Sequence, residues 1–328
     1  MKKTIKKIKE QKISVVMSTY SEPLKWITES IDSILNQTFK DFEFIIINDN
    51  PKRKELQEFL EKYRKQDKRI ILIKNKKNSG PAIARNNGLK IAKGKYIAIM
   101  DADDISLPKR FEIQYKFLEK NKDTFLAGSG WFIIDENSKI LGKRKRAVGY
   151  LKIKKILPEK NCMYNPTVMF RNDKNTFYKD KFKYAQDYDL WLRLLNDGKL
   201  LHNLPNPLIK YRINPNGISQ TKRGKQRLFT EKAREFYQQR VKCGKDKYDE
   251  FNPNEILDID VEKTINKVVL KQEVFASFSK NDFRRARKFC KKYFKNYGYD
   301  NRILIHYILT FTNKRFVNFL RFFKKNFI

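Results

Sequence analysis

The stretch Tyr96-Ile-Ala-Ile-Met100, followed directly by Asp101-Ala-Asp103-Asp104, guides the interpretation of the whole sequence. Its apolar half predicts a buried strand, and that strand ends in three carboxylates within four residues. Neighbouring carboxylates repel one another, so the cluster favours a bound cation, and Mg²⁺ or Mn²⁺ prefers oxygen ligands of this kind. The alternative is an acidic turn without a ligand, because Asp is a common turn residue.

The 328-residue chain has the composition of a globular protein with a strong positive charge. Hydrophobic residues make up 40% of it, which is enough to form a core. It has 73 Lys plus Arg against 37 Asp plus Glu, a formal charge of +36. Such a charge favours anionic partners, such as nucleotides, nucleic acid or acidic lipid, without choosing among them.

Cysteine and histidine usage argues against several kinds of site. Cys162, Cys243 and Cys290 are far apart and lack metal-site spacing, so we expect a reducing compartment and no disulfide framework. His202 and His306 have no partner motif, which argues against a histidine triad or a zinc site. The glycine spacing fits neither a P-loop nor a dinucleotide-binding motif.

Strand and helix patterns alternate along the first hundred residues. This alternation is typical of an α/β fold with a parallel sheet and helices on both faces. Ligands of such sheets bind beyond the carboxyl ends of the strands, where Thr19, Tyr20, Asp49 and the Asp101–Asp104 cluster all fall. The expected strands are 13–20, 42–48, 70–73 and 96–100, and the expected helices begin at Ser21, surround Leu56 and run from Ala82 to Lys93.

The segment Asn78-Ser-Gly80-Pro81 predicts a turn followed by a helix start. Gly80 suits a tight turn and Pro81 suits the first helical turn, so Arg85 can point back toward the same crevice. An arginine there can bind phosphate, or it can pair with an acid on a solvated helix face.

Three further stretches have recognisable patterns. Residues 127–135 alternate like a hairpin strand, and Asn165–Phe170 predicts another strand. A helix begins near Gln186, with Asp187 and Asp189 in its favourable first turn. Asp187 is therefore either a helix cap or a functional carboxylate.

Taken in order, these motifs resemble glycosyltransferase family 2, and in particular the enzymes of bacterial surface-polysaccharide synthesis. The resemblance covers roughly Lys12 to Tyr211. It implies a GT-A fold, which is Rossmann-like with a mostly parallel central sheet, and inverting, metal-dependent chemistry with a nucleotide-sugar. The stretches that carry it are Ile13-Ser-Val-Val-Met-Ser-Thr19-Tyr20, Asp49, Asn78-Ser-Gly80, Ala84-Arg85-Asn86-Asn87-Gly88, Asp101-Ala-Asp103-Asp104 and Gln186-Asp187-Tyr-Asp-Leu-Trp191.

The resemblance also implies roles for single residues. Two positions depart from the family pattern, because Asn48-Asp49-Asn50-Pro51 replaces the usual Asp-Asp-Gly-Ser and Gln186 replaces the usual Glu. Trp191 either stacks on an acceptor sugar or lies in the core. The implied roles are nucleoside pocket for Thr19 and Tyr20, hydrogen bonding to uracil for Asp49, the nucleotide-sugar site for Asn78, diphosphate for Arg85, ribose or metal for Asp101, Mn²⁺ or Mg²⁺ for Asp103, general base for Asp187, and acceptor contacts for Gln186 and Trp191.

The expected function is an inverting transfer of a hexose from a UDP-sugar to a hydroxyl of a growing capsule, lipopolysaccharide, lipooligosaccharide or exopolysaccharide. Two alternatives stay open. A basic nucleic-acid-binding protein could stack bases on its 16 Tyr and 25 Phe. A silent membrane-associated scaffold is the other. Carboxylates gathered at strand ends argue against nucleic acid, because they repel phosphate unless a metal is present.

We expect three regions, namely a basic lead-in (1–11), a GT-A catalytic domain (12–225) and a basic helical region (226–328). The sequence shows neither a signal peptide nor a run of roughly 20 apolar residues, so we expect a cytoplasmic protein that is peripheral on the plasma membrane. A C-terminal amphipathic stripe fits an anionic membrane, or else a helix docked on the catalytic domain. It comprises Phe316, Phe319, Leu320, Phe323 and Phe327, with Lys314, Arg321 and Lys325 opposite.

Overall fold

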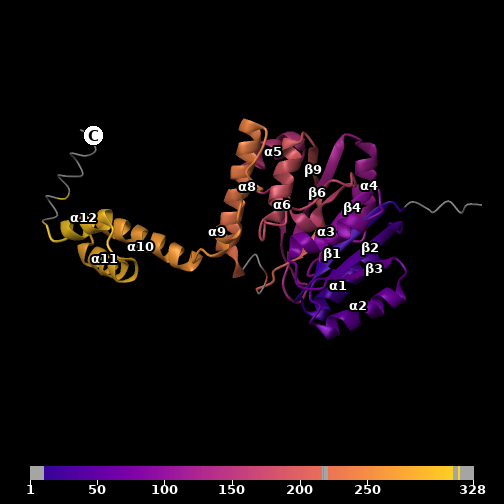
Figure 1. Cartoon of the computed structure of the whole chain (residues 1–328), viewed down its shortest axis with the longest axis horizontal. Helices are drawn as coiled ribbons and strands as arrows, with labels where there is room; N and C mark the ends of the chain where they lie inside the picture. Colours follow the sequence, from indigo (N-terminus) through magenta and orange to yellow (C-terminus); the bar gives the residue numbers. More distant parts are fainter. Residues whose placement is uncertain (1–10, 216, 218–220, 313–316, 318–328) are drawn as a thin grey trace, which may run out of the picture. The chain divides into compact units, whose positions relative to one another are not determined.

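The computed structural model describes residues 11–215, 217, 221–312 and 317, without the side chains of residues 261–266 and 268. The chain forms two compact units, and the first ends at Leu257 (Figure 1). The first unit therefore extends beyond residue 225, where we expected the GT-A domain to end. The cause is helix α8 (Arg223–Cys243), whose Phe229, Ala233 and Phe236 are buried in the core of the first unit.

A single sheet runs through the first unit. Over the described residues it has nine strands in the order β3-β2-β1-β4-β8-β6-β9-β5, with β7 paired to β6. Strands β1 to β4 are parallel, as expected, whereas β8 is antiparallel to both of its neighbours. The strands are β1 Ile13–Thr19, β2 Phe42–Asn48, β3 Ile70–Lys74, β4 Tyr96–Asp101, β5 Ile105–Ser106, β6 Thr124–Ile134, β7 Ile140–Arg144, β8 Met169–Arg171 and β9 Leu200–Arg212.

Helices cover both faces of this sheet, because successive strand side chains point to opposite sides. In β1, Val16 belongs to the core beneath α3 and α6, whereas Val15 and Met17 belong to the core beneath α1, α2 and α4. This confirms the layered α/β arrangement. The helices of the first unit are α1 Leu24–Leu35, α2 Lys54–Gln66, α3 Pro81–Ile91, α4 Arg110–Lys120, α5 Tyr150–Ile156, α6 Gln186–Asn196, α8, and α9 Asn254–Leu257.

Two elements differ locally from the expectations. Residues Asn165–Thr167 form a 3₁₀ turn before β8, because Pro166 has no N–H to donate to a strand ladder. Helix α3 ends at Ile91. The main-chain N–H of Lys93 instead donates to Glu43 Oε1 at 2.6 Å, which brings the following residue against β1.

The second unit consists of α10 (Val261–Ser279), α11 (Phe283–Tyr297) and α12 (Asn301–Leu309). The side chains of Asp282 and Asp300 cap α11 and α12 by accepting main-chain N–H groups. None of the helices in the described part of the chain has both the length and the apolar character needed to cross a bilayer. The expected stripe of Phe316, Phe319, Leu320, Phe323 and Phe327, with Lys314, Arg321 and Lys325, lies outside the described residues.

Gly94 is needed where the chain approaches β1. A Cβ at this position would lie 2.4 Å from the main-chain N of Ser14, and a buried strand backbone cannot move aside. We expect Gly94→Ala to lower the free energy of unfolding by about 1–3 kcal/mol, the usual effect of overpacking. Urea unfolding measures this change. Gly142→Ala is the control, because a Cβ there meets nothing within 4 Å, and equal losses in both variants would contradict the explanation.

Candidate active site

A cavity of about 580 Å³ opens at the carboxyl ends of β1, β2 and β4. Residues that are up to 208 positions apart in sequence (18 to 226) meet there. Ligands of open α/β sheets bind at this edge. The predicted site residues that line the cavity are Thr19, Tyr20, Asp49, Asn78, Arg85, Asp101, Asp103, Gln186 and Asp187.

Asp101 and Asp103 occupy different electrostatic environments. Asp101 Oδ1 accepts a hydrogen bond from Arg85 Nη2 at 2.7 Å, so its charge is paired. Burial, with added repulsion from Asp101 and Glu22, raises the pKa of Asp103 to about 7. The Asn214 amide, 3.5 Å from Asp103 Oδ2, lowers this pKa only weakly. In the part of the chain that the structure describes, Asp103 thus has no ion pair that neutralises its negative charge.

The carboxylates at this edge fit a divalent cation that a bound anion also holds. Among the described residues, no three His, Cys, Asp or Glu side chains are grouped to bind an ion by themselves. Asp104 does not line the cavity, because its Oδ1 accepts the main-chain N–H of Arg212 at 2.9 Å. Mg²⁺ is usually bound by one or two carboxylates together with substrate phosphates. A cation beside Asp103 would offset the burial and the repulsion that together raise its pKa.

Arg85 provides positive charge in the cavity wall. Gly80, at φ 79°, precedes α3 and Pro81 is its first residue, so the expected turn and helix start are confirmed. Arg85, on the next turn, is only 7% exposed. Its Nε and Nη1 atoms are buried without a hydrogen-bond partner among the described residues. Leaving such donors unpaired costs about 1–3 kcal/mol each, which favours an anionic ligand beside Arg85.

Asp49 shapes the loop that precedes α3. Its Oδ1 accepts hydrogen bonds from Asn75 Nδ2 at 2.7 Å and from the Ser79 main-chain N–H at 2.9 Å. Its Oδ2 accepts the Gly80 main-chain N–H at 3.0 Å. Asp49 therefore connects the end of β2 to the loop that carries Asn78, a contribution that the sequence did not reveal.

Asp187 lies in the cavity wall at the start of α6. The preceding Ala185 has φ 54° and ψ 24°, a left-handed conformation that costs roughly 1–2 kcal/mol in a residue with a Cβ. Burial raises the pKa of Asp187, against the opposing effects of the Tyr188 main-chain N–H and the Arg85 charge. Asn161 Nδ2 lies 3.3 Å from Asp187 Oδ2. A carboxylate with a raised pKa is suited to accept a proton near neutral pH.

The rest of α6 is structural. Asp189 is fully buried and pairs with Arg193 Nε at 2.9 Å, so it does not share the exposure of Asp187 to the cavity. Trp191 is also fully buried, in the core that α6 shares with α8 and the sheet. Stacking of Trp191 on an acceptor sugar is therefore corrected to a core role. The physical reason is that α6 runs from the cavity into this core, so a side chain one turn further on is covered.

Sequence reasoning missed Glu22 and Asn214, which both line the cavity. Glu22 Oε2 accepts the Tyr20 main-chain N–H at 2.7 Å, and burial raises the pKa of Glu22. Its position directly after β1 was a usable signal, the same one that pointed to Thr19. Asn214 follows β9, and the place of β9 beside β6 and β5 cannot be read from local sequence patterns.

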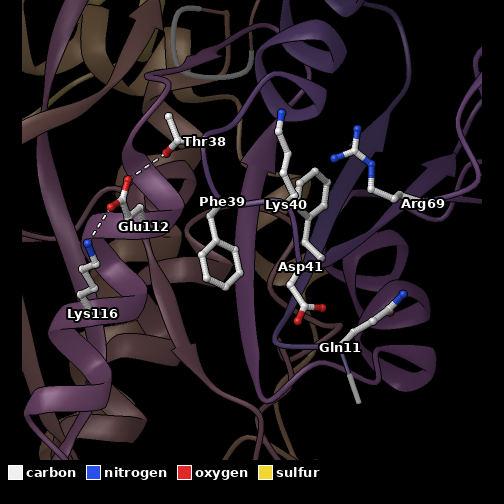
Figure 2. Close-up of a pocket in the computed structure, with 9 residues that line it drawn as sticks. Gln11, Thr38, Phe39, Lys40, Asp41, Arg69, Glu112 and Lys116 are labelled. Atoms are coloured by element: carbon white, nitrogen blue, oxygen red, sulfur yellow. Dashed lines mark hydrogen bonds and ion pairs between the residues drawn. The ribbon is translucent and has the colours of Figure 1, made fainter. Parts of the chain in front are cut away.

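A second, more open cavity of about 760 Å³ lies near the amino ends of the parallel strands, where β2 begins at Phe42 (Figure 2). Figure 2 shows Glu112 bonded to Thr38 and Lys116, and Arg69 is paired with Asp67. These charges are satisfied within the protein. None of the predicted site residues lines this cavity, so its larger volume does not make it the candidate site.

Comparison with known proteins identifies the family. The family model described as Glycosyl transferase family 2 matches residues 14–183, which include Arg85, Asp101 and Asp103. The chain belongs to this family. An uncharacterised glycosyltransferase of Methanocaldococcus jannaschii is 44% identical over 223 residues, 66% of this chain and 76% of its own length. The O-antigen biosynthesis glycosyltransferase WbnJ of Escherichia coli is 39% identical over 206 residues, 61% of this chain and 79% of WbnJ.

The glycosyltransferase also resembles a solved structure. The crystal structure of S. aureus TarS 1-349 in complex with UDP-GlcNAc superposes with a TM-score of 0.53 at 22% identity. The matched part is 64% of this chain and 61% of the crystallised chain. This likeness concerns the fold, and together with the family it confirms the expected GT-A architecture with additional C-terminal helices.

Asp103 makes the stability of this glycosyltransferase depend on pH. Its pKa is raised from 3.8 to about 7, so the stability that its protonated form contributes is present at low pH and is lost as the pH rises through 7. Asp103→Asn does not lose stability in this way, because an amide does not ionise. Between about pH 4 and 7 in metal-free buffer, the variant should gain at least about 1 kcal/mol over the wild type, since one pKa unit corresponds to about 1.4 kcal/mol.

Urea unfolding in EDTA at several pH values measures this difference. Asp197→Asn, an exposed change at the far end of α6, is the control and should track the wild type. A constant offset between Asp103→Asn and the wild type at all pH values would contradict the raised pKa.

Proposed function

We propose that this glycosyltransferase moves a hexose from a UDP-sugar to a hydroxyl group of a growing surface glycan, with inversion at the anomeric carbon. The observation that carries the proposal is the shared cavity of Asp101, Asp103 and Asp187. Arg85 lies among them, since it is bonded to Asp101 and its charge acts on Asp187. A diphosphate and a reacting sugar can therefore be bound within one site.

On the donor side, the proposal assigns the nucleoside to the walls that Thr19, Tyr20 and Asp49 provide. Arg85 would bind diphosphate oxygens with its two unpaired nitrogens. Asp103, with Asp101, would hold Mn²⁺ or Mg²⁺. Such a cation stabilises the negative charge that grows on the leaving nucleoside diphosphate.

On the acceptor side, Asp187 would take the proton from the attacking hydroxyl. A positioned base of this kind typically contributes about 10² to 10⁴ in rate. Gln186, beside it in the cavity wall, would contact the acceptor without adding a second negative charge. Attack opposite the leaving diphosphate inverts the anomeric centre, so an α-linked donor would give a β-linked product.

Two comparisons support the choice of substrates. The relative WbnJ is named for O-antigen biosynthesis, which favours a surface-glycan acceptor. The TarS structure contains UDP-GlcNAc, which favours a UDP-sugar donor. We propose that the protein works in the cytoplasm without nucleic acid as a partner, on acceptors at the inner face of the plasma membrane.

Asp187→Asn tests the proton transfer. The change keeps size and removes the basic group, so we expect transfer to fall by about 10²-fold or more while UDP binding stays within about twofold. Coupled UDP release and calorimetry measure the two quantities. Asp197→Asn, at the other end of α6, is the matched control and should keep full activity. Normal turnover by Asp187→Asn would remove Asp187 from the mechanism.

The second unit supports contact with an anionic membrane. Helix α11 has seven Lys or Arg and no acidic residue, and each such cation near an anionic surface contributes about 1 kcal/mol. Helix α12 and the residues after it expose Ile305, Ile308 and Phe311 at 54%, 56% and 63%. Cations beside exposed apolar groups are typical of helices that lie on a bilayer. The alternative is that this face docks on another part of the protein.

Replacing Ile305 and Ile308 together by Glu tests membrane contact. Burying each Ile contributes about 1.5–3 kcal/mol, so binding to phosphatidylglycerol-containing vesicles should weaken by about tenfold or more. Vesicle co-sedimentation measures this. Val241→Glu changes a similarly exposed aliphatic residue, 60% exposed on α8, and should bind like the wild type. Unchanged pelleting of the double variant would favour the docked helix.

A further inference from the structure

Arg212, the last residue of β9, is a fully buried arginine beside the cavity. A buried guanidinium is stable only when its donors are satisfied, because an arginine cannot lose its charge in a protein. Its environment therefore shows what it holds in place.

The guanidinium contacts three other parts of the first unit. Nε donates to the Asp103 main-chain oxygen at 2.9 Å. Nη1 lies within hydrogen-bond distance of the Asp135 and Glu136 main-chain oxygens and of Ser138 Oγ, at 3.0, 3.1 and 3.0 Å. Nη2 donates to Glu29 Oε2 on α1. Five acceptors thus surround a group that has five N–H donors.

Arg212 also bonds the acidic turn, Asp101–Asp104, through its main chain. Its N–H donates to Asp104 Oδ1 at 2.9 Å, while its Nε bonds the carbonyl of Asp103. Arg212 is therefore bonded to two successive residues of the turn, Asp103 through its carbonyl and Asp104 through its side chain. Immediately beyond, Asn214 Nδ2 lies 3.5 Å from Asp103 Oδ2.

The other side of the guanidinium is also enclosed. It stacks over the Trp26 ring at 5.1 Å, and Trp26 Nε1 donates to the same Glu136 carbonyl at 3.1 Å. Ser138, at the tip between β6 and β7, is held at φ 67° and donates to Glu29 at 2.8 Å. The hairpin tip, α1 and the acidic turn thus share one charged centre.

We propose that Arg212 is a positioning residue that sets the place of the Asp103 carboxylate for the cation and diphosphate of the donor. The inference rests on the proposed function. Because each of the three guanidinium nitrogens donates to a protein acceptor and the side chain is fully buried, Arg212 acts through the turn and does not bind the substrate itself. Groups that orient a metal ligand in this way commonly change metal affinity or activity by about 10- to 100-fold when they are removed.

Lysine cannot replace this arginine. A Lys ammonium keeps the charge but has three donors at a single point, whereas the guanidinium has five donors in a planar fork. Arg212→Lys should therefore leave the acidic turn free of one of its two anchors, while the main-chain bond to Asp104 is kept.

The experiment is calorimetry of UDP binding to the full chain, repeated over a series of Mn²⁺ concentrations. For Arg212→Lys we expect UDP affinity at saturating Mn²⁺ to fall by about tenfold or more, with half-saturation at a higher Mn²⁺ concentration. Asp103→Ala is the positive control. The matched control is Arg171→Lys, since Arg171 bonds the main-chain oxygens of Thr124, Leu118 and Asn121 at the far end of β4.

Arg171→Lys should lower the melting temperature but bind UDP and Mn²⁺ like the wild type. If Arg212→Lys behaves in the same way, Arg212 only stabilises the fold and the inference is wrong. If the wild type itself binds no UDP with Mn²⁺, the proposed function fails and the inference fails with it. Should Arg212→Lys not fold, Ser138→Ala removes one acceptor and should weaken Mn²⁺-dependent UDP binding by about twofold or more, and wild-type binding there overturns the inference.

Discussion

Repulsion between carboxylates at the end of β4 is the constraint on which the first unit depends. Burial, with repulsion from Asp101, raises the pKa of both Glu22 and Asp103 at a place where the sheet core ends. Arg85 pairs with Asp101, and among the described residues Asp103 has no equivalent ion pair. The site therefore contains a negative charge, on Asp103, that a cationic ligand can neutralise. A structure that only needed a stable turn would have paired or removed the second charge.

Local patterns predicted the half of the fold that lies in the first hundred residues. The almost continuously buried strands β1 and β2, and the Gly80-Pro81 start of α3, are dictated by short-range chemistry and appear where expected. The order of β8, β6, β9 and β5 depends on long-range pairing and was not predicted. For the same reason the sequence predicted helix in the region of α8 but not that its apolar face belongs to the core of the first unit, where it packs beside α6.

The candidate site divides in the same way. The sequence predicted Asp101, Asp103 and Asp187 as site residues because they follow a strand end or begin a helix. In open α/β sheets, ligands bind beyond the carboxyl ends of the strands. For Trp191 the sequence left two roles open, stacking on an acceptor sugar and burial in the core, because helical spacing does not distinguish a cavity wall from a core. Arg212 gave no local signal at all. Its importance comes from contacts with residues 74 to 183 positions away, which only the folded chain brings together.

Positive charge proved to be a poor guide to function. The chain carries +36 overall, yet the arginines that matter near the cavity, Arg85 and Arg212, are buried and held by individual carboxylates. Nucleic acid binding was compatible with composition alone, whereas the chain belongs to glycosyl transferase family 2.

The position of the unit boundary bears on how the protein is made. Among the described residues every strand pairing, including the distant one between β6 and β9, is complete by Arg212, and the first unit closes at Leu257. Domains usually fold as units, with the N-terminal one first during synthesis. The first unit can thus begin to fold while α10, α11 and α12 are still being translated.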